Sequence, residues 1–175
     1  MRRSLLLLLA LTSLALGAGL AACTPKPRVA PGVVVEAFYA ELLTHPIFGP
    51  PDSGAFPRIA HFLGDTLQAR LLAARAEMER EARAAPNDKP ALADDDLFSS
   101  LMEGPTSFYV KATGEGKGRS VVLVQFEDRT GNALVQWVDT AYVVPRDTTW
   151  VIDDIHFGGT WPMAARGTLL HRLLP

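Results

Sequence analysis

The stretch that decides the fold runs from Phe108 to Phe157 and reads FYVKATGEGKGRSVVLVQFEDRTGNALVQWVDTAYVVPRDTTWVIDDIHF. Its apolar residues alternate with a period of two or form β-rich runs, and clusters of Gly, Asp, Asn and Pro interrupt them. The interruptions are short, so the pattern predicts an antiparallel meander. Its four expected strands cover residues 108–112, 121–126, 134–144 and 150–157.

Helical periodicity precedes this stretch and returns after it. Apolar residues recur at helical spacing over residues 31–44, and a short helix is expected around Pro57. Asp65 is expected to cap a longer amphipathic helix, with Gln68 completing a capping box. A last short helix is expected over residues 163–174. This order predicts the α+β class, with the N-terminal helices packed on one face of a four-stranded antiparallel sheet.

The N-terminus has the layout of a secretory leader. Arg2 and Arg3 precede an apolar run over residues 5–16, and small residues follow it. We therefore expect a signal peptide over residues 1–22. An uncleaved helical anchor is the alternative, because residues 5–22 carry no charge and are barely long enough to span a bilayer.

The end of the leader resembles the lipobox of bacterial lipoproteins. Residues 20–23 read Leu-Ala-Ala-Cys, and in such proteins the thiolate of the Cys takes up diacylglycerol. We expect Cys23 to be lipidated and followed by a tether over 23–30, whereas an ordinary buried thiol is the alternative. The acyl chains would hold a single domain, residues 31–175, at a membrane. By resemblance to enterobacterial sorting, Thr24 favours the outer membrane, facing the periplasm.

Charge and cysteine content exclude several classes of protein. With 17 Lys and Arg against 19 Asp and Glu, the chain is not a basic nucleic-acid binder. One Cys excludes a disulfide framework and a Cys-based zinc site. A hydrophobic content of 48% is too high for a disordered chain, and one long uncharged stretch excludes a polytopic membrane protein. We expect no cofactor and no metal.

Several loose motifs of the domain occur together in one bacterial family. They are the Val-x-x-Phe-Tyr pattern at 35–39, a long helix after a short one, an acidic patch before Phe98 and the closing strand at 150–155. Together they resemble the domain of unknown function 3828 family, which has a cystatin-like, nuclear-transport-factor-2-like shape. The resemblance covers about residues 31–175 and implies a curved sheet that cups a long helix. The family name carries no activity.

One pair of residues suggests catalysis. Asp154 and His156 lie two positions apart on the last expected strand, so they should face the same side, together with Trp150 and Ile152. A carboxylate beside an imidazole can act as an acid–base pair in a cone-shaped pocket. The competing interpretation is that both side chains belong to the solvent-facing half of the strand. Phosphate loops, serine nucleophile elbows and His-x-x-x-His patterns do not occur in the sequence.

An acidic run invites a calcium interpretation. Asp94, Asp95 and Asp96 are consecutive, but the run lacks the alternating oxygen ligands, the Gly and the distal Glu of a calcium loop. Capping of a short turn by Asp95 or Asp96 is the better account.

Aromatic residues gather in the sheet half and suggest binding. Gln136 and Tyr142 share a face of the third expected strand, and Trp137 and Trp150 fall on strand positions where aromatic area could reach the second face. Apolar residues of both parities at 121–124 predict that both faces are partly covered. We therefore expect a membrane-tethered binding module for a small apolar ligand or a protein partner, such as an immunity-type inhibitor. A small enzyme and a structural envelope lipoprotein are the alternatives.

Overall fold

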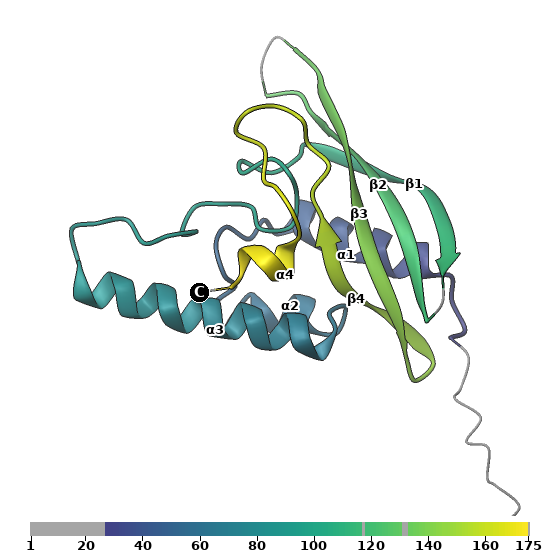
Figure 1. Cartoon of the computed structure of the whole chain (residues 1–175), viewed down its shortest axis with the longest axis horizontal. Helices are drawn as coiled ribbons and strands as arrows, with labels where there is room; N and C mark the ends of the chain where they lie inside the picture. Colours follow the sequence, from purple (N-terminus) through teal and green to yellow (C-terminus); the bar gives the residue numbers. More distant parts are fainter. Residues whose placement is uncertain (1–26, 117, 131–132, 175) are drawn as a thin grey trace, which may run out of the picture.

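A computed structural model describes residues 27–116, 118–130 and 133–174 of the chain. The expected signal peptide and Cys23 lie outside the described residues. The described part is an α+β domain, as expected, in which helices lie before and after one antiparallel sheet (Figure 1). Within these ranges, no helix combines the length and the apolar composition that crossing a membrane requires.

The sheet has four strands in the order β1-β2-β3-β4, and each pairs antiparallel with the next. The strands are β1 (Ser107–Gly116), β2 (Arg119–Asp128), β3 (Val135–Arg146) and β4 (Thr149–His156). Two of the hairpins are tighter than the sequence indicates, because Gly118 and Asp147 adopt positive φ angles of 75° and 53°. Such angles match the twist of two-residue hairpin turns, so the flanking strands extend into the expected turns.

A bulge in β4 changes which of its residues share a face. Val143 pairs with Ile152 and Tyr142 pairs with Asp154, so β4 contains one additional residue, Asp153, at this point. Side chains alternate along a strand, and one additional residue moves all later side chains to the opposite face. The expectation that Asp154 shares a face with Ile152 is therefore wrong.

The helices are α1 (Pro31–Thr44), α2 (Phe56–Ala60), α3 (Asp65–Ala84) and α4 (Leu169–Arg172). The expected capping box of α3 is absent from the described residues. Gly64 is the N-cap residue, and Asp65 already belongs to the helix. The side-chain amide of Gln68 donates to the carbonyls of Ala60 and Leu63 at 2.9 and 2.8 Å. Gln68 thus ties α3 to the end of α2.

The last helix is much shorter than the expected 163–174. Gly167 has a φ angle of 75°, which breaks any helix that would run through it. Thr168 then caps α4, because its hydroxyl oxygen accepts a hydrogen bond from the His171 amide at 3.3 Å. The apolar residues before Gly167 therefore lie in turns.

The hydrophobic core lies between the helices and one face of the sheet, which we call the inner face (Figure 1). The inner face contributes Val122, Val124, Phe126, Trp137, Ala141, Val143, Ile152 and Ile155. Phe38 and Tyr39 of α1 pack edge-on against each other, and Tyr39 packs edge-on against Phe126. Each such buried side chain stabilises the fold by about 1.5–3 kcal/mol. Trp137 is 5% exposed and stacks on Phe126, so its aromatic area is not on the second face.

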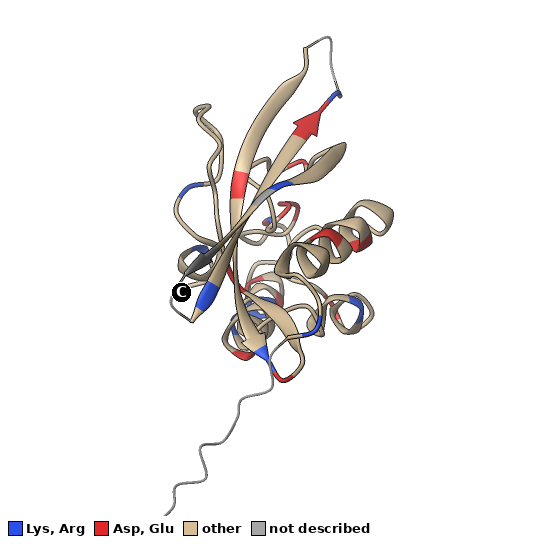
Figure 2. Cartoon of the chain, turned by 90° about the vertical axis from the view of Figure 1, so that its right-hand side faces the viewer, with Lys and Arg blue, Asp and Glu red and all other residues tan. Residues whose placement is uncertain are grey.

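The outer face of the sheet is half-exposed. Val121, Leu123, Val138 and Tyr142 lie on it, and each is intermediate between buried and exposed. Figure 2 shows that the strands are uncharged over much of their length. Thr140, Asp154 and His156 also lie on the outer face, which therefore combines apolar and polar side chains.

Candidate functional site

Asp154 and His156 share a face of β4, as expected from their spacing, but this face is not the one that packs against the core. Both lie on the outer face of β4, as their pairing with Tyr142 and Thr140 requires. Oδ1 of Asp154 accepts hydrogen bonds from the amides of Ile155 and Leu170, at 2.8 and 2.9 Å. Asp154 therefore holds the first turn of α4 against β4. His156 is exposed, and neither side chain lines any of the three cavities described below.

The three expected binding residues are not brought together. Gln136 and Tyr142 share the outer face, but six residues of strand separate them by about 20 Å. The Arg119 guanidinium lies 4.3 Å above the centre of the Tyr142 ring. Trp150 pairs with Pro145 on the inner-face side, and its indole donates to the Val29 carbonyl at 3.0 Å. Gln136 and Tyr142 are too far apart, and Trp150 lies on the other face of the sheet, so the three residues do not form one binding surface.

The acidic run before Phe98 divides into three separate roles. Asp94 forms an ion pair with a lysine of the same loop, and Asp95 pairs with Arg172 of α4. Asp96 turns inward, and its Oδ1 accepts a hydrogen bond from the Phe98 amide at 2.7 Å. Across the part of the chain that the structure describes, no three His, Cys, Asp or Glu side chains meet as metal ligands would.

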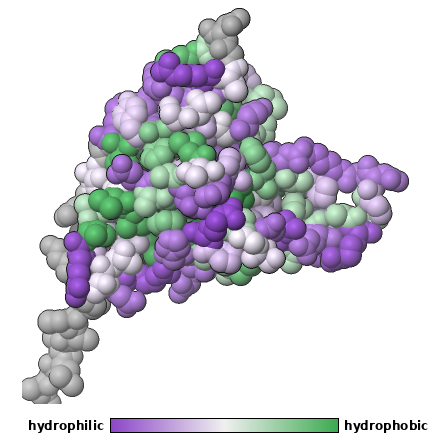
Figure 3. Space-filling model, turned by 180° about the vertical axis from the view of Figure 1, so that it is seen from behind, coloured by the Kyte–Doolittle hydropathy of each residue, from purple (hydrophilic) through white to green (hydrophobic). Residues whose placement is uncertain are grey.

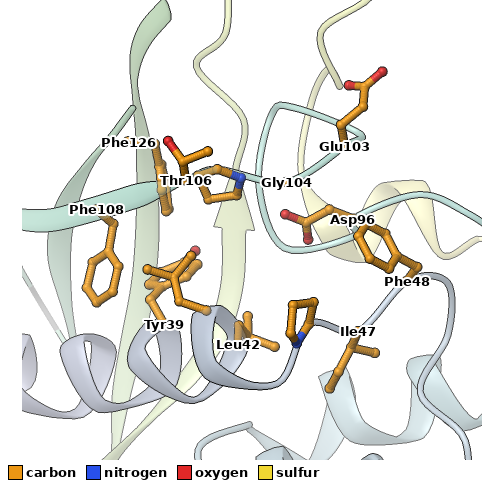
Figure 4. Close-up of a pocket in the computed structure, with 13 residues that line it drawn as sticks. Tyr39, Leu42, Ile47, Phe48, Asp96, Glu103, Gly104, Thr106, Phe108 and Phe126 are labelled. Atoms are coloured by element: carbon orange, nitrogen blue, oxygen red, sulfur yellow. The ribbon is translucent and has the colours of Figure 1, made fainter. Parts of the chain in front are cut away.

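A cavity of about 280 Å³ opens between the C-terminal end of α1, the loop after it and the segment 103–106 (Figure 4). We call it the mouth cavity. Four aromatic rings line it, those of Tyr39, Phe48, Phe108 and Phe126. Tyr39 is 3% exposed and Phe126 is fully buried, so the cavity reaches the hydrophobic core.

Three of the rings form a continuous aromatic wall. The Tyr39 ring centre lies 4.9 Å from that of Phe126 and 5.6 Å from that of Phe108. The Tyr39 hydroxyl donates to the Phe98 carbonyl at 3.0 Å, which fixes the ring in place. Burial, together with the nearby carboxylates of Asp139 and Asp96, raises the pKa of Tyr39 well above its ordinary value. The wall is therefore uncharged and rigid.

Asp96 is the buried polar group of the mouth cavity. Its side chain points into the space enclosed by the surrounding residues (Figure 4), although the residue is only 9% exposed. Oδ2 accepts a hydrogen bond from the Ser99 hydroxyl at 2.8 Å, in addition to the bond from Phe98 to Oδ1. Burial raises the pKa of Asp96 to about 6, and these hydrogen bonds partly oppose the rise.

A glycine allows the neighbouring loop to pack on this carboxylate. Gly104 has a φ angle of 80°, and a Cβ atom there would lie 3.4 Å from Oδ2 of Asp96. Glu103 stands at the rim, with its carboxylate directed away from the cavity centre (Figure 4). Among the described residues that line the cavity, none is Lys, Arg or His, so its charge is negative.

Asp139 is a second buried carboxylate, with a different environment. It lies on the inner face of β3 and is 1% exposed. Its oxygens accept hydrogen bonds from the Ser100 amide at 2.8 Å, the Gly158 amide at 2.8 Å and the Trp137 indole at 3.1 Å, and also from the Ser100 hydroxyl. Burial raises the pKa of Asp139 despite these donors. Asp139 joins two loops to the sheet and is a structural group.

Two further cavities are larger but less defined chemically. One, of about 490 Å³, lies between α3, Leu92 and α4, where α3 and the following loop extend from the body (Figure 3). Its charged residues have both signs and none is buried. The other, of about 500 Å³, follows the loop 46–55 beside Arg58 and Arg75. Neither of them presents a buried polar side chain to a ligand.

Sequence reasoning missed the two buried carboxylates, although the sequence contains signals for both. Asp139 alternates with Trp137 and Ala141, so the period of two places it on the apolar face of its strand. Asp96 was expected only to cap a turn, which it does. The signal for its burial is the apolar Leu97-Phe98 pair that follows at once.

Comparisons with known proteins do not test the expected family resemblance. No family model, curated protein or solved structure matches the chain. The residues that suggested the resemblance are buried where a core requires them, with Val35, Phe38 and Tyr39 on the inner side of α1. The family membership stays a prediction.

Proposed function

We propose that this protein is a membrane-anchored binding module of the bacterial cell envelope that holds a small, mainly apolar ligand in the mouth cavity. The observation that supports the proposal is the cavity itself, which has an aromatic wall that reaches the core and one buried polar group. Ligand sites are typically concave, mostly apolar and provided with a few placed polar groups that orient the ligand. The cystatin-like shape and its curved sheet belong to the same proposal.

The position of the tether supports this role. The Arg28 amide donates to the Thr148 carbonyl at 2.9 Å, and Trp150 binds Val29, so the start of the domain is fixed to the β3–β4 hairpin. From there α1 leads away, and the mouth cavity lies at its far end. A helix of 14 residues is about 20 Å long. A domain anchored by its N-terminus would therefore open its cavity away from the anchor.

The anchor is part of the proposal. The leader over residues 1–22 and the lipobox ending at Cys23 support acylation of Cys23 and attachment to the outer membrane on its periplasmic side. Replacement of Cys23 by Ala should abolish incorporation of radiolabelled palmitate into the chain. Label that persists in the Cys23→Ala variant would contradict the anchor.

A titration followed by NMR tests the cavity. The full chain is prepared with ¹³C-labelled methyl groups and held in neutral micelles. Benzyl alcohol, a small neutral aromatic probe, is then added in increasing concentration. We expect saturable shifts at Leu42, Leu43 and Ile47, which line the cavity, and none at Leu72, which is exposed on α3.

A matched pair of variants makes the test specific. Leu43 and Leu72 are both half-exposed helix residues, at 37% and 50%. Leu43→Trp should fill the cavity and weaken probe binding at least about tenfold, which corresponds to 1.4 kcal/mol of binding free energy. Leu72→Trp should leave binding unchanged. Equal binding by both variants, or no saturable shift in the parent chain, would refute the proposed site.

A further inference from the structure

The negatively charged side chains of the mouth cavity disfavour an anionic ligand. Asp96 presents its carboxylate to the interior, and Glu103 adds a second negative charge at the rim (Figure 4). None of the described lining residues supplies a positive charge to balance them. The nearest cation, Arg172, forms its ion pair with Asp95, so an anionic ligand would meet the Asp96 carboxylate at short range in a medium of low polarity, where electrostatic interactions are strong.

The carboxylate of Asp96 retains capacity to bind. Each of its oxygens accepts one hydrogen bond, from the Phe98 amide and the Ser99 hydroxyl. A carboxylate has about four acceptor positions, so about two remain. The Phe98 amide and the Ser99 hydroxyl fix the group, and its side chain points into the cavity (Figure 4).

The aromatic wall is suited to the same kind of ligand. Tyr39, Phe108 and Phe126 present an uncharged ring surface beside the carboxylate. The faces of aromatic rings attract cations, and the attraction is greatest when the cation has left bulk water. The rings also accept the apolar part of a ligand.

We propose that the mouth cavity binds an organic cation: an ammonium group on a small apolar body, with the ammonium at Asp96 and the body against Tyr39, Phe108 and Phe126. This inference rests on the proposed function, because it names the class of ligand for the same cavity. Asp96 acts here as a binding residue.

Three probes with one common ring distinguish the cation from other ligands. They are benzyltrimethylammonium, benzyl alcohol and phenylacetate, each titrated into the full chain while the cavity methyl groups are observed. We expect benzyltrimethylammonium to bind about tenfold more tightly than benzyl alcohol, because the Asp96 carboxylate attracts the cation and has no such attraction for the neutral probe. Phenylacetate should bind most weakly.

Isosteric variants assign the preference to one group. Asp96→Asn keeps an oxygen to accept from the Phe98 amide and removes the charge, so the tenfold preference should disappear while benzyl alcohol binding stays the same. Glu103→Gln should weaken cation binding by no more than about threefold, because its carboxylate points away from the centre. Glu36→Gln removes a charge from the exposed side of α1 and serves as the control.

A pH series provides a measurement that needs no variant. Benzyltrimethylammonium keeps its charge at every pH, so any change in its affinity must come from the protein. The groups facing Asp96 are the Tyr39 hydroxyl from α1, Asp139 from β3, Arg172 from α4 and Glu103 from the rim. With the pKa of Asp96 near 6, affinity for the cation should fall about fivefold from pH 7.5 to pH 5. Benzyl alcohol affinity should stay constant.

The outcomes separate the two proposals. If benzyl alcohol saturates the cavity but the cation binds no more tightly, or if Asp96→Asn keeps the preference, the cation inference is wrong and the binding module stands. If none of the three probes shifts the cavity methyl groups, both proposals are wrong. A cation preference that Asp96→Asn abolishes, together with the pH dependence, supports both.

Discussion

Asp96 and Asp139 are both buried carboxylates, yet they are used in opposite ways. Asp139 receives donors from Ser100, Trp137 and Gly158, which belong to separate segments, and is enclosed on every side. Among the described residues, the donors to Asp96 are Phe98 and Ser99 of its own turn, and the carboxylate faces a cavity. A carboxylate whose acceptor positions are filled by donors from distant segments holds the fold together. A carboxylate whose donors come from its own turn can be fixed in place and still bind a ligand.

The largest expected effect tests the structural side of this comparison. Asp139→Ala leaves the amides of Ser100 and Gly158 and the Trp137 indole without their acceptor. We expect a loss of about 3–5 kcal/mol in the free energy of unfolding, measured by urea denaturation, because buried donors left unpaired are costly. Asp88→Ala, at an exposed loop position, is the control. Equal stability of the two variants would contradict the structural role of Asp139.

The second effect is the pH dependence that Asp96 gives to stability. Its folded pKa of about 6 is raised above the usual value of 3.8 for this side chain, so the folded state binds the proton more tightly than the unfolded state does. This contribution is fully present below about pH 4 and is lost as the pH rises to about 6. Between these limits, the parent chain should lose about 2 kcal/mol of unfolding free energy relative to Asp96→Asn.

Urea denaturation of both chains from pH 4 to pH 7 measures this difference. The carboxylates of Asp52 and Glu127, whose pKa values are lowered, titrate at more acidic pH and are common to both chains. A constant difference between the two chains over the range would show that Asp96 is not a raised-pKa group.

A smaller effect separates backbone strain from contact with Asp96. Gly104 and Gly118 have φ angles of 80° and 75°, so an Ala at either position should cost about 1 kcal/mol of stability. Only at Gly104 would the added methyl group touch the Asp96 carboxylate. We therefore expect Gly104→Ala to weaken binding of benzyltrimethylammonium and Gly118→Ala to leave it unchanged. Equal affinities would mean that the segment 103–106 does not shape the site.

The smallest effects are expected at the residues that the sequence first suggested for catalysis. Asp154→Ala should cost about 1 kcal/mol, the usual effect of losing a helix-capping group, because Oδ1 accepts from Leu170 in the first turn of α4. His156→Ala should change stability by less than about 0.5 kcal/mol, as for an ordinary surface position. Neither variant should alter probe binding in the NMR titration. Loss of binding in either would move the site toward β4.

The sequence predicted the α+β class and the region of each strand, because local periodicity carries that information. It did not predict the bulge at Asp153, which depends on how β4 pairs with β3 and which separates Asp154 from the face of Ile152. The face to which a strand residue points cannot be assigned when the strand pairing is unknown, because one additional residue moves every later side chain to the opposite face.

The mouth cavity was beyond sequence reasoning for a different reason. Its wall combines Tyr39 from α1 with Phe108 and Phe126 from two strands, and Asp96 comes from the loop between α3 and β1. Only the packing of α1 on the sheet brings them together. By contrast, the burial of Asp139 follows from strand parity alone, so a closer reading of the 135–146 pattern would have found it.

The most direct test of the central claim is a ¹³C NMR titration of the Asp96 carboxyl carbon, with and without saturating benzyltrimethylammonium. We expect a pKa of about 6 for Asp96 in the free protein and a lower pKa with the cation bound, because a neighbouring positive charge favours the carboxylate. The Asp139 signal should show no comparable response, because that group does not line the cavity. An Asp96 pKa that does not change when the cation saturates the protein would contradict the account.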